Sequence, residues 1–112
     1  MIQFSKPIYE KRLPFIKLTK SKNGQTGTAT FVFIHPFIFR NSLYSFTQIN
    51  GIYLIWGKKE IISTDIEIIF RKGKPFLLKA IFIFKNSMEW FNFLSFMQFY
   101  ANETGLFFKS ST

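Results

Sequence analysis

The feature that most constrains the fold is a pair of strand-like runs separated by a short gap that contains glycine. Leu13–Ser21 alternates and becomes polar toward its end, and Thr28–Ile34 is rich in β-branched and aromatic residues. Between the two runs, Asn23-Gly24 and Gly27 are strong turn signals. The sequence therefore predicts a β-hairpin with its tip over Asn23–Gly27, which implies an antiparallel sheet.

Further segments have the composition and the bounding turns of strands. They are Ile2–Ser5, Ile49–Trp56 with a bulge at Gly51, Glu60–Phe70 as one alternating strand, and Phe76–Phe84. A two-residue turn at Lys72-Gly73 would pair the last two. The register expected from it places Phe70 opposite Pro75, Ile68 opposite Leu77 and Ile66 opposite Lys79. Phe76–Phe84 is apolar on both faces, which is typical of a central strand covered on both sides.

A single long helix is predicted near the end of the chain. Asn86 and Glu89 form a capping-box pattern, and Gly105 suits the position just after the helix. One apolar stripe follows helical spacing through Trp90, Phe93, Leu94, Met97 and Tyr100, widened by Phe91, Phe96 and Phe99. The prediction is therefore an α+β fold, with an antiparallel β-sheet built from hairpins and one long C-terminal α-helix packed on it. A chain of 112 residues fits a single domain over residues 1–112.

Charge and composition leave two interpretations open. A net charge of +9 favours an acidic partner (nucleic acid, anionic lipid or an acidic protein face) or describes a basic solvated surface. The 17 Phe residues reflect function or an A+T-rich genome such as that of an organelle. Zero cysteines exclude disulfides, thiol nucleophiles and Cys-bound metals. With no visible targeting segment or apolar run of membrane-spanning length, we expect a soluble or peripheral protein.

Catalytic and metal-binding patterns are nearly absent. His35 is the only histidine, and a metal site would need partners that the sequence lacks. Asp65 and Glu67 project from one face of the predicted strand, a spacing that suits a carboxylate pair for acid–base chemistry. A solvated strand face opposite lysines explains the same spacing. We therefore expect no enzymatic activity, catalytic residue, cofactor or metal, and keep Asp65 with Glu67 as the enzymatic alternative.

A basic sheet that carries aromatic residues is also typical of single-stranded RNA binding. Aligned on Gly27, the segment Thr26–Phe33 matches the RNA-recognition signature at only three positions. Thr28 and Thr30 stand at its inner aromatic positions, which removes the stacking platform, and only one helix is evident where that fold has two. A basic single-stranded RNA-binding sheet module stays as the alternative function, although we expect no nucleic-acid partner.

The predicted hairpin offers a third class of function, a protein-interaction surface. Lys17, Lys20 and Lys22 line one arm and the tip, with Lys20 and Lys22 on one face. Thr28 and Thr30 lie on the returning arm. A hairpin at a sheet edge can accept a partner's strand through main-chain hydrogen bonds, or it can be a solvated hairpin whose lysines discourage aggregation. The residues alone do not decide between these two interpretations.

Sequence blocks along nearly the whole chain resemble a known family. They are "LTKSKNGQTGTATFVF" followed by Pro36, then "INGIYLIW", and then "GKPFLLKAIFIFKNSMEWFNFLSFMQFYANETGLFF". Their most specific parts are Gly27-Thr28-Ala29-Thr30-Phe31, Gly51-Ile52-Tyr53-Leu54-Ile55, Gly73-Lys74-Pro75, Glu89-Trp90, Phe96-Met97, Tyr100-Ala101 and Gly105-Leu106. In order and spacing, the chain resembles the Psb28 family of photosystem II assembly factors, also called the photosystem II thirteen-kilodalton protein.

The resemblance implies a non-catalytic protein with an antiparallel sheet that binds transiently to the stromal or cytosolic face of immature photosystem II. The implied docking area involves the large core antenna chlorophyll protein and lies near cytochrome b559. In that family a partner's tail can extend the sheet. The basic positions that match the family pattern are Lys17, Lys20 and Lys22, and the adjoining Thr28 and Thr30 are taken with them as partner-binding residues.

Two departures from the family pattern make this chain more basic and more apolar. Trp56 and Lys58-Lys59 stand where acidic residues are usual, and Phe91–Phe99 carries less charge than usual. The A+T-rich composition favours a plastid-encoded protein, so we expect a peripheral location on the stromal side of the chloroplast thylakoid, or the cytosolic side in a cyanobacterium. Because stromal loops are themselves basic, anionic thylakoid lipids are an expected further partner, bound less tightly as salt rises.

Overall fold

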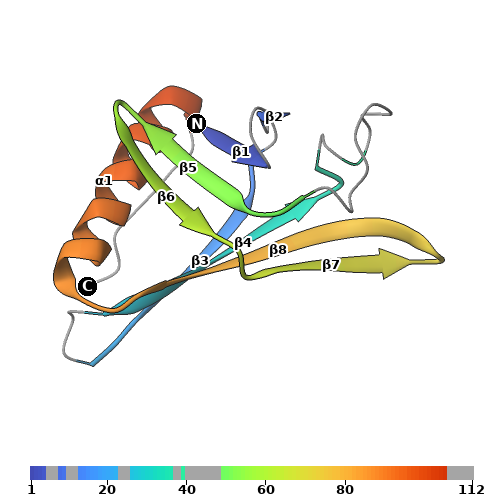
Figure 1. Ribbon diagram of the computed structural model, residues 1–112, viewed down its shortest axis with the longest axis horizontal. Helices are drawn as coiled ribbons and strands as arrows, with labels where there is room; N and C mark the ends of the chain where they lie inside the picture. The colour runs from blue at the N-terminus through green and yellow to red at the C-terminus, as the bar shows by residue number, and fades with distance from the viewer. Residues whose placement is uncertain (5–7, 10–12, 23–25, 37–38, 40–48, 106–112) are drawn as a thin grey trace.

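The computed structural model describes residues 1–4, 8–9, 13–22, 26–36, 39 and 49–105, and in this part of the chain eight strands precede one helix (Figure 1). The strands are β1 (Ile2–Phe4), β2 (Ile8–Tyr9), β3 (Phe15–Lys20), β4 (Gly27–Ile34), β5 (Ile52–Trp56), β6 (Lys59–Ser63), β7 (Ile66–Arg71) and β8 (Lys74–Phe84). The helix is α1 (Ser87–Thr104). Every strand pair is antiparallel, which confirms the predicted α+β class.

The strands form two four-stranded sheets, in the orders β2-β1-β5-β6 and β3-β4-β8-β7. The prediction of one strand over Glu60–Phe70 is therefore wrong, because β6 and β7 belong to different sheets. Between them, the buried Ser63 hydroxyl donates to the Ile81 carbonyl at 2.5 Å and accepts from the Asp65 N–H at 3.2 Å. The Ile81 N–H then donates to the Asp65 carbonyl at 3.0 Å, so these bonds turn the chain from one sheet into the other.

The hairpin β7–β8 turns at Lys72-Gly73 as predicted, and both residues have positive φ (53° and 79°). Phe70 lies opposite Pro75 as expected, but Ile68 lies opposite Leu78 and Ile66 opposite Ala80. The register shifts by one residue between Ile69 and Phe70, which corrects the two inner pairs. Pro75 has no N–H to give to a ladder, and such a residue is typically found at a bulge.

Helix α1 begins and ends where the sequence predicts. The Asn86 side chain accepts a hydrogen bond from the Glu89 N–H at 2.9 Å, and the Glu89 carboxylate accepts from the Lys85 N–H at 2.7 Å. At the other end, Gly105 has a φ of 75° and its N–H donates to the Ala101 carbonyl. Phe91 is wrongly assigned to the apolar stripe, because its side chain is 62% exposed.

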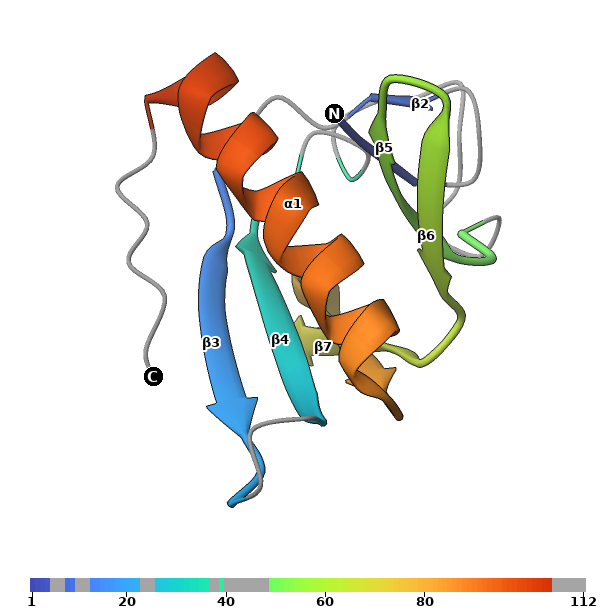
Figure 2. The same cartoon turned by 90° about the vertical axis from the view of Figure 1, so that its left-hand side faces the viewer.

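The core lies where the two sheets and the helix meet (Figure 2). Phe4 of β1 packs edge-on against Phe33 of β4 at 5.0 Å between ring centroids, which joins the sheets. Phe31 contacts Phe93 of the helix at 6.1 Å. The buried residues of β8 are those of its inner face: Leu78, Ala80, Phe82 and Phe84.

Two predictions about the strands need correction. The opposite face of β8 is not covered, because Ile83 is 60% exposed and the other residues on that face are only partly buried. The expected cover on both faces is therefore wrong. Gly51 forms no bulge, since it lies just before β5 and the register between β5 and β6 runs without a shift.

Candidate partner-binding surface

Strand β3 forms an edge of the second sheet in the part of the chain that the structure describes. Its hairpin with β4 is closed by the Ser21 N–H, which donates to the Thr26 carbonyl at 3.0 Å. The tip itself, predicted over Asn23–Gly27, falls partly outside the described residues. Because peptide groups alternate in direction along a strand and that of Ser21 points toward β4, the peptide N–H of Lys20 points away from it. Lys20 thus offers a main-chain donor at the edge.

The structure divides the five predicted partner-binding residues. Lys17 lies opposite Thr30, and Thr28 lies two pairs further along, opposite Thr19. Lys17, Thr28 and Thr30 are on the outer face of the sheet, away from the core. Lys20 lies opposite Gly27, whose buried position is on the inner face, and Lys22 follows the strand in the turn. The three lysines are exposed, and both threonines are partly buried. Lys17, Thr28 and Thr30 therefore share one surface, whereas the Lys20 side chain lies on the other face of the sheet.

The outer face also carries apolar residues that sequence reasoning missed as surface residues. Phe15 is 67% exposed and Ile83 60%, at opposite ends of this face. Their alternation with core residues is the signal that could have identified them. The residues next to each of them in sequence point to the opposite face and are more buried. This alternation is uninformative for β8, because both faces of that strand are apolar and only tertiary packing decides which one is covered.

The carboxylate pair expected as an enzymatic alternative does not form a site. Asp65 lies in the corner between β6 and β7, and Glu67 lies on β7 opposite Lys79. Both are exposed. Among the described residues, no group of three or more His, Cys, Asp or Glu side chains is placed to hold a metal ion. His35 is exposed, and its ring packs edge-on against Phe76 at 5.0 Å.

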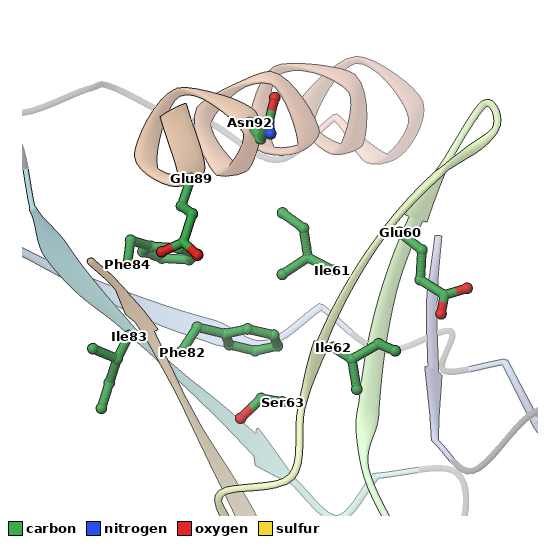
Figure 3. Close-up of a pocket in the computed structure, with 9 residues that line it drawn as sticks. All are labelled: Glu60, Ile61, Ile62, Ser63, Phe82, Ile83, Phe84, Glu89 and Asn92. Carbon is green, nitrogen blue, oxygen red and sulfur yellow. The ribbon is translucent and has the colours of Figure 1, made fainter. Parts of the chain in front are cut away.

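A cavity of about 320 Å³ opens between β6, the end of β8 and the start of α1 (Figure 3). Its lining consists of Glu60, Ile61, Ile62, Ser63, Phe82, Ile83, Phe84, Glu89 and Asn92. Glu89 already accepts the capping hydrogen bond from Lys85, and Figure 3 shows Glu60 pointing away from the space between Ile61 and Phe82. Neither Asp65 nor Glu67 lines this cavity, so it gives no support to acid–base chemistry.

The phenylalanines in the segment that partly matches the RNA-recognition signature are buried in the core. Phe31 and Phe33 are almost completely buried, at 0% and 1% exposure. Their rings therefore lie on the inner face, where a base could not stack on them. Thr28 and Thr30 of the same strand, which stand at the inner aromatic positions of the signature, lie on the outer face.

Comparisons with known proteins agree over nearly the full length of the chain. Residues 2–108 match the family model described as "Psb28 protein". Proteins named "Photosystem II reaction center Psb28 protein" are 40% identical in Nostoc sp. over 110 residues, 41% in Synechocystis sp. over 110 and 38% in Pyropia yezoensis over 111. The alignments span 98%, 98% and 99% of this chain and 97%, 96% and 96% of those relatives, respectively. In the described residues, α1 does not have the length and apolar character of a transmembrane helix.

Proposed function

Because this chain belongs to the Psb28 family, we propose that it is a non-catalytic assembly factor for photosystem II. It binds transiently to the stromal face of immature complexes that contain the large core antenna chlorophyll protein, in the vicinity of cytochrome b559. The location that follows is peripheral, on the plastid thylakoid, or on the cytosolic side of the membrane in a cyanobacterium. The observation that supports this function best is the edge at β3, which pairs only with β4 among the described residues; Lys17 lies on this strand, and Thr28 and Thr30 lie on the adjacent β4.

The edge supports recognition through the main chain. A partner segment in extended conformation would pair with β3, and each hydrogen bond formed would contribute about 1 kcal/mol net. Lys17 and Lys20 would then contact acidic or carbonyl groups of that segment, while Thr28 and Thr30 lie one strand further in. This mode of binding needs no pocket and no reactive group.

A proline at position 20 tests this mode of binding. Because the Lys20 N–H points away from β4, Lys20→Pro removes a donor from the edge while the ladder between β3 and β4 stays intact. The matched control is Lys20→Gln, which removes the same charge and keeps the N–H. We expect Lys20→Pro to lower co-migration with immature photosystem II on native gels about fivefold relative to Lys20→Gln, from the loss of about 1 kcal/mol.

The assay is native-gel fractionation of thylakoids followed by immunodetection. The proposed function predicts the protein in immature complexes and its absence from the mature dimer. Equal amounts in mature and immature complexes would contradict an assembly role. Equal co-migration of the two Lys20 variants would contradict pairing at β3 and leave the family role to a different surface.

A further inference from the structure

The far end of the β7–β8 hairpin carries a basic cavity that the proposed function does not use. Its volume is about 440 Å³, and it is lined by His35, Arg71, Lys72, Lys74, Pro75 and Phe76. We call these six residues the basic tip. Three of them are permanent cations and none is acidic, so the cavity complements an anionic group.

Contacts with Phe76 hold two side chains of the basic tip, Arg71 and His35, in place. The Arg71 guanidinium carbon lies 4.8 Å from the centroid of the Phe76 ring. The His35 ring packs edge-on against the same ring, with 5.0 Å between the two ring centroids. The Phe76 carbonyl also accepts a hydrogen bond from the His35 N–H at 3.0 Å. These contacts fix the end of β4 against the hairpin, and Arg71 and His35 both contact the same aromatic ring.

Exposed apolar residues accompany the cations. Ile34, Leu77 and Ile69 form one row across β4, β8 and β7 on the outer face, because Leu77 pairs with both of its neighbours. Ile34 is 39% exposed and Ile69 38%, and Phe70, next to Arg71, is 49% exposed. The hairpin end thus combines an apolar row with at least three cations at its tip.

We propose that the basic tip docks on the surface of an anionic lipid bilayer. The cations would meet the phosphate or sulfonate of the head groups, and the apolar row would enter the boundary between head groups and acyl chains. A polynucleotide would complement the cations equally well but would leave Ile34 and Ile69 without an apolar environment. The combination of both kinds of residue therefore favours a lipid surface. This inference does not depend on the role in photosystem II assembly.

Vesicle binding by two variants of equal charge tests the proposal. The tip variant Arg71→Gln/Lys72→Asn/Lys74→Gln removes three cations, and Asn suits the positive φ of Lys72. The control variant Lys17→Gln/Lys20→Gln/Lys22→Gln removes three cations from the β3 side. We expect the tip variant to bind phosphatidylglycerol vesicles about 100-fold more weakly than the unchanged protein, because each basic residue near the surface contributes about 1 kcal/mol. The control should lose less than tenfold, and no protein should bind pure phosphatidylcholine.

Equal losses in the two variants would overturn the proposal, because net charge alone would then explain the binding. Stronger binding of the unchanged protein to single-stranded polynucleotide than to phosphatidylglycerol vesicles at matched salt would overturn it as well. A separate variant, Phe70→Ser, tests the apolar contribution and should weaken vesicle binding at high salt, where charge is screened. Urea unfolding checks that each variant is folded. In detergent extracts without a bilayer, the tip variant should still co-migrate with immature photosystem II, which separates this proposal from the proposed function.

Discussion

Gly27 lies where the β3–β4 hairpin meets the helix, and replacing it by alanine should distort that junction. An added Cβ would lie 2.7 Å from Cζ3 and 2.9 Å from Cε3 of Trp90, and 2.9 Å from the Thr19 carbonyl oxygen. Trp90 is 97% buried and packs against Phe84 and Phe93, so its ring has little room to move away. The Thr19 oxygen belongs to the backbone of β3 and can shift only with the strand.

The size of the effect follows from these contacts. Overpacking of a filled core costs about 1–3 kcal/mol, and contacts with a backbone atom and a buried ring place Gly27→Ala at the upper end. Alanine also restricts the unfolded chain, which returns about 0.4–1 kcal/mol. We therefore expect Gly27→Ala to lower the free energy of unfolding by about 2 kcal/mol, measured by urea denaturation with an unchanged m-value.

A double-mutant cycle identifies the cause of that loss. Trp90→Leu removes the ring that the new methyl group would meet, so the loss caused by Gly27→Ala should be about 1 kcal/mol smaller in this background. The contact with Thr19 stays, and the rescue is therefore partial. A change below 0.5 kcal/mol for Gly27→Ala alone, or a loss that is the same with and without Trp90, would refute the steric explanation.

Two further predictions concern the core and the helix. Phe33→Ala should lower the free energy of unfolding by about 3–5 kcal/mol, whereas Phe15→Ala should change it by less than about 0.5, since Phe33 is 1% exposed and Phe15 67%. Urea denaturation of both variants checks this contrast, and similar losses would contradict the assignment of inner and outer faces. Asn86→Ala should cost about 1 kcal/mol because it removes the acceptor for the Glu89 N–H, and Asn86→Ser should restore most of it. Helix content from far-UV circular dichroism at rising urea concentration measures this, and equal midpoints for Ala and Ser would speak against side-chain capping.

The sequence predicted the helix ends and hairpin turns, because these are set by residues that are close together in the chain. The cap at Asn86, the stop at Gly105 and the turn at Lys72-Gly73 are set by side-chain capping and by positive φ, which the residue types reveal directly. The hairpin of β3 and β4 was predictable for the same reason. The candidate edge residues Lys17 and Lys20 follow from that hairpin, although which face each occupies became clear only from the buried neighbours.

Features that depend on contacts distant in the sequence were not predictable. The apolar alternation of Ile62, Ile66 and Ile68 continues across the corner, and only the bond between Ser63 and Ile81 on another strand reveals the break. The register shift beside Phe70 likewise depends on where the long strand β8 must pair with β4. The basic tip was missed because His35 and Phe76 lie 41 positions apart and meet only through the packing of the sheet.

Only the inner face of β8 is buried, so the two faces of this strand should vary differently among relatives. The inner face of β8 fills the core, so replacements there must preserve size and shape; its residues are Leu78, Ala80, Phe82 and Phe84. The outer face of the same strand does not fill the core, so only contacts with other molecules constrain its residues, at positions 77, 79, 81 and 83. Two substitution rates should therefore alternate residue by residue along this single strand, and slow change at an outward position would mark contact with another molecule.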